Sequence, residues 1–248
     1  MSLYGVGALV VDALLGLLTR RTHRHLERIP ARGPVVVVAN HISLADPLVV
    51  ACALRRARRR ATFLTMVEAF SWPGVGWLLR RTEQIPVDRG LSGRRAEALQ
   101  PALDALRAGH CVALYPEGRI TTDPGYRMLP TGRTGAVRLA LAAGCPVLPM
   151  AQWGAQELFS REHTSSLTRR PRFRGRWGSE RTPRRPRITV LVGEPITAAE
   201  LWAAGGVDQP PLEGHQPPEP DPAVLRAATA EVMSRLRALR AEIVPDEA

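Results

Sequence analysis

The chain has 248 residues and a formal net charge of +11, and it contains no lysine, so its basic side chains besides histidine are all arginine. A hydrophobic content of 45% is ordinary for a globular protein and argues against wholesale disorder, while the positive charge favours anionic membranes, nucleic acid or phosphorylated substrates. Three isolated cysteines without a CxxC pair argue against a disulfide scaffold or a zinc site and indicate a reducing compartment.

Residues 3–18 are apolar apart from Asp12 and predict a helix. Sixteen helical residues span about 24 Å, which is short of the roughly 30 Å core of a bilayer. With no basic stretch before them and no A-x-A motif after them, a secretory signal is not expected. Four arginines follow between positions 20 and 28. Two interpretations stay open: the helix lies in the membrane interface with these arginines on lipid headgroups, or it covers the core of the domain.

From residue 29 onward, short β-branched runs alternate with helical patterns. Strands are predicted at 34–40, 61–66, 83–89, 110–118, 145–153 and 187–195. Helices are predicted at 46–56, 92–109 and 132–144, and a short helix or hairpin at 71–81. Pro101 is expected to kink or split the helix in which it falls. The alternation predicts an α/β fold, a single domain with a mostly parallel central sheet flanked by helices.

The remaining segments set the predicted domain organisation. Residues 161–187 predict a loop or insertion, because nine arginines stand between positions 169 and 187 with little hydrophobic period. Residues 205–222 are rich in proline, glycine and acid and predict a linker, after which an amphipathic helix begins. The predicted parts are an N-terminal apolar helix with a basic segment (1–28), an α/β domain (29–204), and a linker with a C-terminal helix (205–248).

His41 and Asp46 are the first candidates for chemistry, because His41 directly follows the predicted central strand. Ligands bind at the carboxyl ends of strands in open α/β sheets, and a histidine there can act as a general base. Asp46 could orient it if the chain turns between them, since five helical residues would leave the two side chains about 140° apart. Asp46 also directly precedes a proline at a helix start, which is typical of an ordinary helix cap. The local sequence leaves both interpretations open.

A second group of candidates also follows strand-like runs. Glu117, Gly118 and Arg119 form a turn on which a carboxylate and a guanidinium could hold a hydroxyl and a phosphate. Arg89 ends another such run, and Arg133 stands between two glycines before a helix. The alternative is a surface turn with a Glu–Arg pair of little energetic value. Nucleotide hydrolysis is not favoured, because the glycines around Arg133 lack the GK[ST] of a P-loop.

Taken together, these motifs resemble those of the PlsC-like glycerolipid acyltransferases, the 1-acylglycerol-3-phosphate acyltransferase type. The stretch "NHISLADP" is similar to the His-x4-Asp block of that family, and "SWPGVGWLLRRTEQIPVDR" is similar to its second block. The stretches "YPEGR" and "GCPVLPMAQWG" are similar to the third and fourth blocks of the family. The order and spacing also match, and the resemblance covers roughly residues 29–195.

The resemblance implies that His41 deprotonates an acceptor hydroxyl, which then attacks an acyl thioester directly, and that Asp46 orients His41. It implies lysophosphatidic acid as the acceptor and phosphatidic acid as the product, in phospholipid biosynthesis. Acyl-CoA or acyl carrier protein would be the co-substrate, with no metal and no other cofactor. The apolar N-terminal helix and the tryptophans at 72 and 77 would dock the protein on an anionic membrane, peripherally or monotopically, at the cytoplasmic face of the cell membrane.

The same resemblance implies that Arg89, Glu117, Gly118 and Arg119 bind the glycerol phosphate, with Arg133 as an addition. The sequence departs from the family in two places, because Arg119 follows the glycine without the usual intervening residue, and the Arg-rich insertion is not part of the general pattern. The alternative with the same chemistry is another lysophospholipid or a glycolipid acceptor. The alternative of another class is a non-catalytic basic protein on membranes or nucleic acid, although nucleic acid is not expected because aromatic residues are few and not interleaved.

Overall fold

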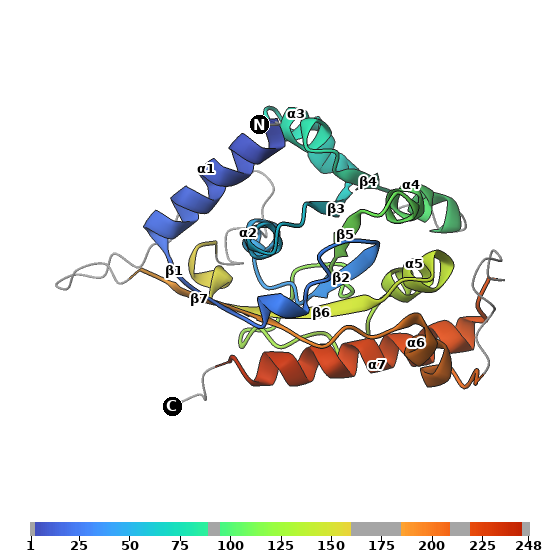
Figure 1. Cartoon of the computed structure of the whole chain (residues 1–248). Coiled ribbons are helices and arrows are strands. Elements are labelled where there is room, and N and C mark those ends of the chain that lie inside the picture. The colour runs from blue at the N-terminus through green and yellow to red at the C-terminus, as the bar shows by residue number, and fades with distance from the viewer. Residues whose placement is uncertain (1–2, 89–94, 160–184, 209–218, 245–248) are drawn as a thin grey trace.

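The computed structural model of the chain describes residues 3–88, 95–159, 185–208 and 219–244 (Figure 1). Its centre is a seven-stranded sheet with the strand order β1-β7-β6-β2-β5-β3-β4. Among these strands β6 and β7 pair antiparallel, and the other neighbours pair parallel. The strands are β1 (Arg20–Arg24), β2 (Val35–Ala39), β3 (Ala61–Met66), β4 (Ile85–Val87), β5 (Cys111–Leu114), β6 (Val147–Trp153) and β7 (Arg187–Val192). The predicted α/β fold with a mostly parallel sheet is confirmed.

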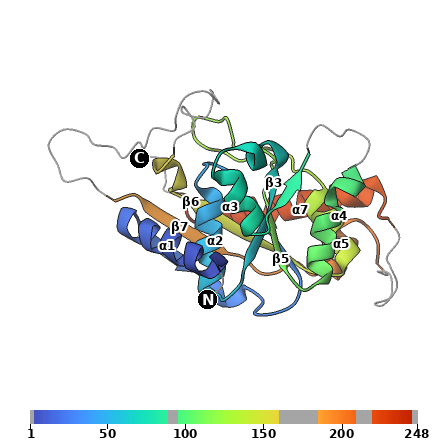
Figure 2. The same ribbon diagram turned by 90° about the horizontal axis from the view of Figure 1, so that it is seen from above.

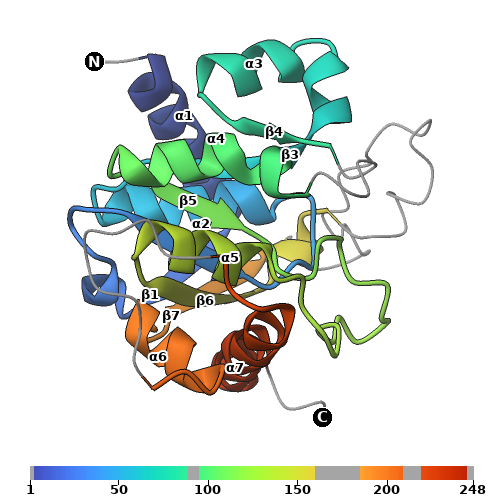
Figure 3. The same cartoon turned by 90° about the vertical axis from the view of Figure 1, so that its right-hand side faces the viewer.

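Helices cover both faces of this sheet. On one face lie α1 (Leu3–Leu18) and α2 (Asp46–Arg56), side by side (Figures 1 and 2). The other face is covered by α4 (Arg95–Arg107), α5 (Gly135–Ala143), α6 (Ala198–Ala204) and α7 (Pro222–Ala241), with α4 next to α5 and α6 next to α7 (Figure 3). Near the β3–β4 edge, a 3-10 turn (Val67–Ser71) precedes α3 (Val75–Arg81), and two further 3-10 turns lie at Leu26–Arg28 and Ala155–Glu157.

The valines of β2 explain the layered architecture. Val35 and Val37 belong to the core shared with α1 and α2, whereas Val36 and Val38 belong to the core shared with α4 to α7. All four side chains have no exposed surface. A strand that is buried on both faces carries a continuous apolar run instead of an alternating one, so this run places β2 in the middle of the sheet. The residues that follow β2 therefore emerge at the centre of the sheet's carboxyl edge.

Several boundaries differ from the predictions. Strand β1 was not predicted, because an arginine-rich run has little strand propensity by itself; it forms by parallel pairing with β7. The short helix α6 was also missed, although Thr197 and Glu200 form a capping box at its start. Pro101 does not split α4, which is continuous over Arg95–Arg107. The segment 71–81 contains a helix and no hairpin.

One arginine of the basic run, Arg21, is not available to lipid headgroups. Its side chain is only 7% exposed and bonds Asp12 in the middle of α1. Arg55, at the end of α2, bonds the other oxygen of Asp12 at 2.9 Å. Burial opposes the charged form of Asp12, but these hydrogen bonds outweigh it and lower its pKa to about 2. The one charged residue of the apolar helix therefore fastens α1 to α2.

The interpretation in which the N-terminal helix covers the core of the domain holds for part of α1, while its contact with a membrane interface stays a prediction. Leu15 is buried in the core under α1, and Val11 packs against the same core. Leu14 and Leu17 are 52% and 62% exposed, and Leu9, Val10 and Leu18 are exposed as well. Of the helices in the described part of the chain, none has both the length and the apolarity needed to cross a bilayer.

Parts of the predicted insertion and linker lie outside the described residues, namely 160–184 and 209–218. Arg187, where the predicted insertion and the predicted strand 187–195 overlap, is the first residue of β7. The C-terminal helix is confirmed as α7, and the carboxylate of Asp221 caps it by accepting from the backbone N–H of Ala223. The cysteines at 52, 111 and 145 are all buried and unpaired.

Candidate active site

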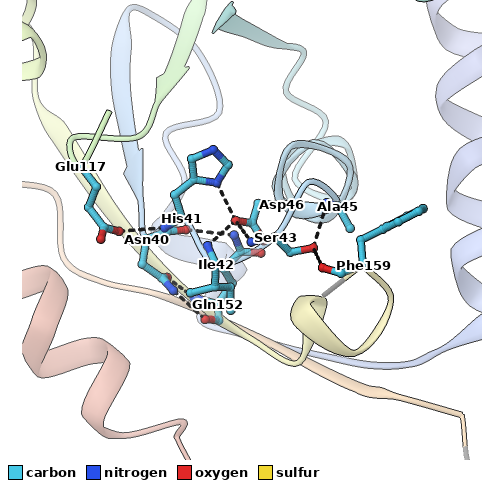
Figure 4. A network of polar contacts seen from close by, with 9 residues as sticks. All are labelled: Asn40, His41, Ile42, Ser43, Ala45, Asp46, Glu117, Gln152 and Phe159. Atoms are coloured by element: carbon cyan, nitrogen blue, oxygen red, sulfur yellow. Dashed lines mark hydrogen bonds and ion pairs between the residues drawn. The ribbon is translucent and has the colours of Figure 1, made fainter. Parts of the chain in front are cut away.

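The predicted catalytic pair and the predicted acceptor ligand Glu117 come together at the carboxyl edge of the sheet. His41 follows β2, and Glu117 follows β5, the parallel neighbour of β2. Neighbouring parallel strands end at the same edge, so these residues meet although 76 positions separate them. Figure 4 shows His41, Asp46 and Glu117 together, with Asn40 and Gln152 beneath them.

The His41–Asp46 contact forms through a turn that precedes α2. Nδ1 of His41 lies 2.7 Å from Oδ2 of Asp46. The same oxygen accepts the backbone N–H groups of Ile42 at 2.6 Å and Ser43 at 2.8 Å (Figure 4). The N-cap position of α2 is Ala45, and the bonds of Asp46 run back toward the turn, whereas those of an N-cap side chain run forward into the helix. The structure thus favours the orienting interpretation of Asp46 over the ordinary cap.

Ser43 holds this turn in shape. Its hydroxyl accepts the backbone N–H of Ala45 at 3.0 Å and donates to the carbonyl of Phe159 at 3.0 Å. Asp46 itself has no exposed surface. Burial is the larger influence and raises the pKa of Asp46 above its ordinary value, while the hydrogen bonds from His41 and the two backbone amides oppose this shift.

The proton on His41 is fixed by this arrangement. Because Oδ2 of Asp46 accepts two backbone N–H groups as well, it is an acceptor for Nδ1, which therefore carries the ring proton. Nε2 is left with a lone pair. The side chain of His41 is 14% exposed, whereas that of Asp46 is 0% exposed. This arrangement can take up a proton from a bound hydroxyl while the buried carboxylate stabilises the imidazolium.

Tyr115 is a site residue that was not predicted. Its ring stacks on the imidazole of His41 with a centroid distance of 4.0 Å and an interplanar angle of 15°. The ring of Phe63 in β3 also lies nearly parallel to that of Tyr115, with a centroid distance of 6.5 Å and an interplanar angle of 16°. Burial raises the pKa of Tyr115 well above its ordinary value, so the phenol stays neutral. Stacking restricts rotation of the imidazole, and the only sequence signal was the position of Tyr115 just before the "PEG" turn.

Glu117 supports the backbone of the site. One carboxylate oxygen accepts the N–H of His41 at 2.8 Å, and the other accepts the N–H of Leu129 at 2.9 Å. The residue is 4% exposed, and burial raises its pKa although both N–H groups oppose this shift. Both oxygens are thus engaged by the protein itself. Its predicted contact with the acceptor stays a prediction.

The structure brings Gly118, Arg119 and Arg133 together at one turn. Gly118 has a φ of +68°, and a Cβ there would collide with the side chain of Arg133. The backbone N–H of Arg133 donates to the carbonyl of Pro116 at 2.8 Å, which fixes the approach. Arg119 and Arg133 are both exposed. Arg89, the other predicted phosphate ligand, lies outside the described residues.

Asn40 and Gln152 hydrogen-bond to each other beneath the site. Neither was predicted as a functional residue. Asn40 Oδ1 accepts the backbone N–H of Gln152 at 2.8 Å, and its amide donates to the carbonyl of Gln152 at 3.0 Å. The Gln152 side chain donates to the carbonyl of Asn40 at 3.0 Å. Asn40 opens the "NHISLADP" stretch, which was the available signal. These bonds join the ends of β2 and β6, so the residue before His41 is held by three hydrogen bonds to β6.

The C-terminal helix also reaches the site, through the loop that carries Leu129. Arg240 of α7 donates to the carbonyl of Tyr126 at 3.0 Å, and its guanidinium lies 5.0 Å from the ring centre of Trp153. Arg237 donates to the carbonyl of Pro130 at 3.0 Å. The two arginines therefore hold the loop whose Leu129 N–H binds Glu117. No local motif signals this contact, since it joins residues more than 100 positions apart.

Comparison with known proteins agrees with this architecture. The model of the Acyltransferase family matches residues 20–153, which is more than half of the chain, and the chain belongs to this family. The matched segment contains the whole His41–Asp46–Glu117 arrangement and the four blocks noted in the sequence.

The individual relatives carry two kinds of name. A lyso-ornithine lipid O-acyltransferase of Pseudomonas aeruginosa is 36% identical over 121 residues, 48% of this chain and 43% of that protein. A 1-acyl-sn-glycerol-3-phosphate acyltransferase of Chlamydomonas reinhardtii is 29% identical over 141 residues, 56% of this chain and 40% of that protein. The chain thus spans less than half the length of either relative. The crystal structure of the 1-acyl-sn-glycerophosphate acyltransferase PlsC of Thermotoga maritima shares the fold, with a TM-score of 0.64 at 22% identity, covering 99% of this chain and 81% of that one.

Proposed function

We propose that the chain is an acyltransferase that moves a fatty acyl group from an acyl thioester to the hydroxyl of a lysophosphatidic acid, giving phosphatidic acid. The observation that carries the proposal is the 2.7 Å contact between His41 and the buried Asp46 at the carboxyl edge of the sheet. It lies inside the segment that matches the family. A proton-accepting imidazole beside exposed arginines suits an acceptor that carries both a hydroxyl and a phosphate.

In the proposed reaction, Nε2 of His41 takes the proton of the acceptor hydroxyl as the oxygen attacks the thioester carbonyl. The tetrahedral intermediate collapses by breaking the carbon–sulfur bond, and the departing thiolate receives the proton from the imidazolium. Asp46 stabilises that imidazolium through Nδ1. The co-substrate is acyl-CoA or acyl carrier protein loaded with a fatty acid, and the reaction calls on no other cofactor. Arg119 and Arg133, with Arg89, Glu117 and Gly118, are the proposed acceptor-binding residues.

A lyso-ornithine lipid is the second candidate acceptor, because the relative at 36% identity carries that name. The decisive experiment offers the purified protein both acceptors, and further lysophospholipids and glycolipids, with acyl-CoA or acyl carrier protein as donor. Thiol release and the lipid product are followed together. Product from lysophosphatidic acid is the expected result. Product from the lyso-ornithine lipid and not from lysophosphatidic acid would identify the lyso-ornithine lipid as the acceptor and leave the proposed chemistry unchanged. No product from any acceptor with either donor would contradict the proposed function.

The proposed location is the cytoplasmic face of the cell membrane, in peripheral or monotopic contact with an anionic surface. The support is a set of exposed large apolar side chains on α1, around the start of α2 and around α3, which we propose as a docking surface. The N-terminal end of α1 lies on the same side of the molecule as α3 (Figures 1 and 3). Large apolar side chains gathered on one surface are typical of a contact with lipid or protein. This docking surface comprises Leu9, Val10, Leu14, Leu17, Leu18, Leu44, Leu48, Val67, Trp72, Val75, Trp77 and Leu78.

The double variant Leu14→Asp/Leu17→Asp is expected to bind anionic lipid vesicles at least about ten-fold more weakly, because each buried leucine contributes about 1.5–3 kcal/mol. Co-sedimentation with vesicles measures this effect. The double variant Ala227→Asp/Ala230→Asp adds the same charge at exposed positions of α7, on the other face, and is expected to bind normally. Equal loss in both variants, or complete release of the wild type by salt, would contradict apolar docking and favour the purely electrostatic class of basic binding protein.

Replacing Arg240 by Met is expected to lower kcat by up to about 10²-fold, because a misplaced loop shifts Leu129, Glu117 and the backbone of His41 in turn. Amide hydrogen exchange over the 121–130 loop is expected to speed up in the same variant. The control is Arg226→Met, since Arg226 is an exposed arginine of the same helix. An unchanged rate together with unchanged amide exchange in Arg240→Met would show that α7 does not position the site.

A further inference from the structure

A small basic cavity lies at the end of the sheet opposite His41. It has a volume of about 180 Å³ and forms where β3 and β5 begin. Tyr115, stacked on His41, follows the other end of β5, so the cavity and the candidate active site flank the same strand at its two ends. The lining residues of the basic cavity are Arg58, Arg59, Arg60, Thr62, Gly109, His110 and Cys111.

The basic cavity holds more positive charge than its surroundings balance. Arg59 is only 8% exposed, and its guanidinium donates to the carbonyl of Gly33 at 2.6 Å. Arg60 pairs with Glu83 at 2.9 Å, outside the lining, and among the described residues the lining contains no carboxylate. A buried charge costs several kcal/mol unless it is paired, so a buried guanidinium facing a cavity favours entry of an anion.

The arginine and threonine side chains around the basic cavity can donate hydrogen bonds. The guanidinium groups provide forked donors that fit an oxyanion, and Thr62, which is 4% exposed, adds a hydroxyl. Burial raises the pKa of Cys111 to about 12, so the thiol stays neutral and supplies no counter-charge. His110 is exposed at the rim. Drug-sized ligand pockets occupy about 300–1,000 Å³, and this cavity is smaller, which fits a compact anion.

Capping of α2 does not account for these arginines. Two carbonyls near the end of α2 are bound by backbone N–H groups, since the amide of Arg58 donates to Arg55 at 2.9 Å and that of Arg59 to Leu54 at 2.9 Å. The guanidinium groups are therefore not needed as C-terminal caps. Arg58 has a φ of +59°, a conformation that few non-glycine residues adopt, and this turn places three successive arginine side chains around the cavity.

We propose that the basic cavity is a second anion site, which binds a phosphate group and stabilises the fold independently of the acceptor site near His41. The phosphate belongs to a soluble phosphoanion or to a lipid headgroup, since the donor set recognises the same oxygens in both. Binding there would tie α2, β3 and β5 together at the end of the sheet that the candidate active site does not use.

The experiment titrates the full chain with inorganic phosphate at constant ionic strength and follows both thermal unfolding and the heat of binding. A saturable rise of Tm is expected. Arg58→Ala, which removes an exposed lining side chain, is expected to weaken phosphate binding about ten-fold or more, as loss of a charge-assisted contact does. Arg59→Met is expected to abolish phosphate binding. If Arg59→Met does not fold, Arg58→Ala still tests the site. The matched control is Arg226→Ala, which is expected to bind phosphate normally.

Two further arms assign the site and the source of the phosphate. Arg119→Ala, near the candidate active site, is expected to leave the phosphate-dependent rise of Tm in place, so the result does not depend on the proposed acyl transfer. Vesicles containing phosphatidic acid replace inorganic phosphate in the second arm. If Arg58→Ala binds inorganic phosphate like the wild type but binds these vesicles more weakly, the site is supported with a lipid headgroup as its ligand. The proposal is overturned if Arg58→Ala matches the wild type with both probes, or if Arg119→Ala alone removes the effect.

Discussion

The His41→Ala variant is expected to lose acyl transfer by about 10²- to 10⁴-fold, which is the range that a general base contributes. The proton of the acceptor hydroxyl would then have no acceptor at the position of Nε2. The fold is expected to survive, because the Asp46 carboxylate keeps its bonds to the backbone N–H groups of Ile42 and Ser43. Thiol release measures the rate, and thermal unfolding measures the stability.

The matched control for this variant is His25→Ala. His25 has a side chain that is 40% exposed and pairs with Glu27, away from the carboxyl edge of the sheet. Its removal is expected to leave the rate of acyl transfer unchanged. A His41→Ala protein that folds and still transfers the acyl group at the wild-type rate would show that the imidazole takes no part in the mechanism.

The Asp46→Asn variant is expected to lose both activity and stability. Oδ2 of Asp46 accepts three N–H groups, and Oδ1 is buried without a hydrogen-bond partner among the described residues. An asparagine must place its NH₂ group at one of these two positions, so it either faces three donors or buries a donor without an acceptor. The corresponding change in a Ser-His-Asp triad lowers kcat by about 10⁴-fold, because the imidazole adopts the wrong tautomer.

The expected loss of stability in Asp46→Asn is about 1–3 kcal/mol, the cost of a buried polar group that is left unsatisfied. Steady-state kinetics and denaturant unfolding measure the two effects separately. Asp104→Asn is the control, since Asp104 is an exposed carboxylate on α4 with a side chain that is 62% exposed. If Asp46→Asn kept both the rate and the stability of the wild type, the carboxylate would neither orient His41 nor hold the turn.

The elements that follow from local pattern were predictable. β2 and α2 were evident because a continuous β-branched run and a proline near a helix start are strong signals. β1 was not predictable, because its arginines form a strand only through pairing with β7, far along the chain. Pro101 lies in the middle of α4 and does not split it, since a proline inside a helix removes one backbone hydrogen bond without ending the helix in every case.

The site was predictable in its parts but not in its connections. The sequence offered His41 and Asp46 as a possible pair, and it left open whether Asp46 was only a helix cap. The answer depends on a turn whose shape is set by Ser43 and by the distant Phe159. Glu117 was predicted to contact the acceptor, but its oxygens bind backbone groups, and such bonds depend on how strands pair.

The central claim is that an acceptor hydroxyl, activated by His41, attacks the thioester directly. A single-turnover reaction with isotopically labelled acyl thioester and lysophosphatidic acid, quenched at successive times, tests it most directly. The label is expected to pass to phosphatidic acid in step with thiol release, in the wild type and not in His41→Ala, and the protein is expected to remain unlabelled. Label that first accumulates on the protein, or that appears only as free fatty acid, would contradict direct transfer.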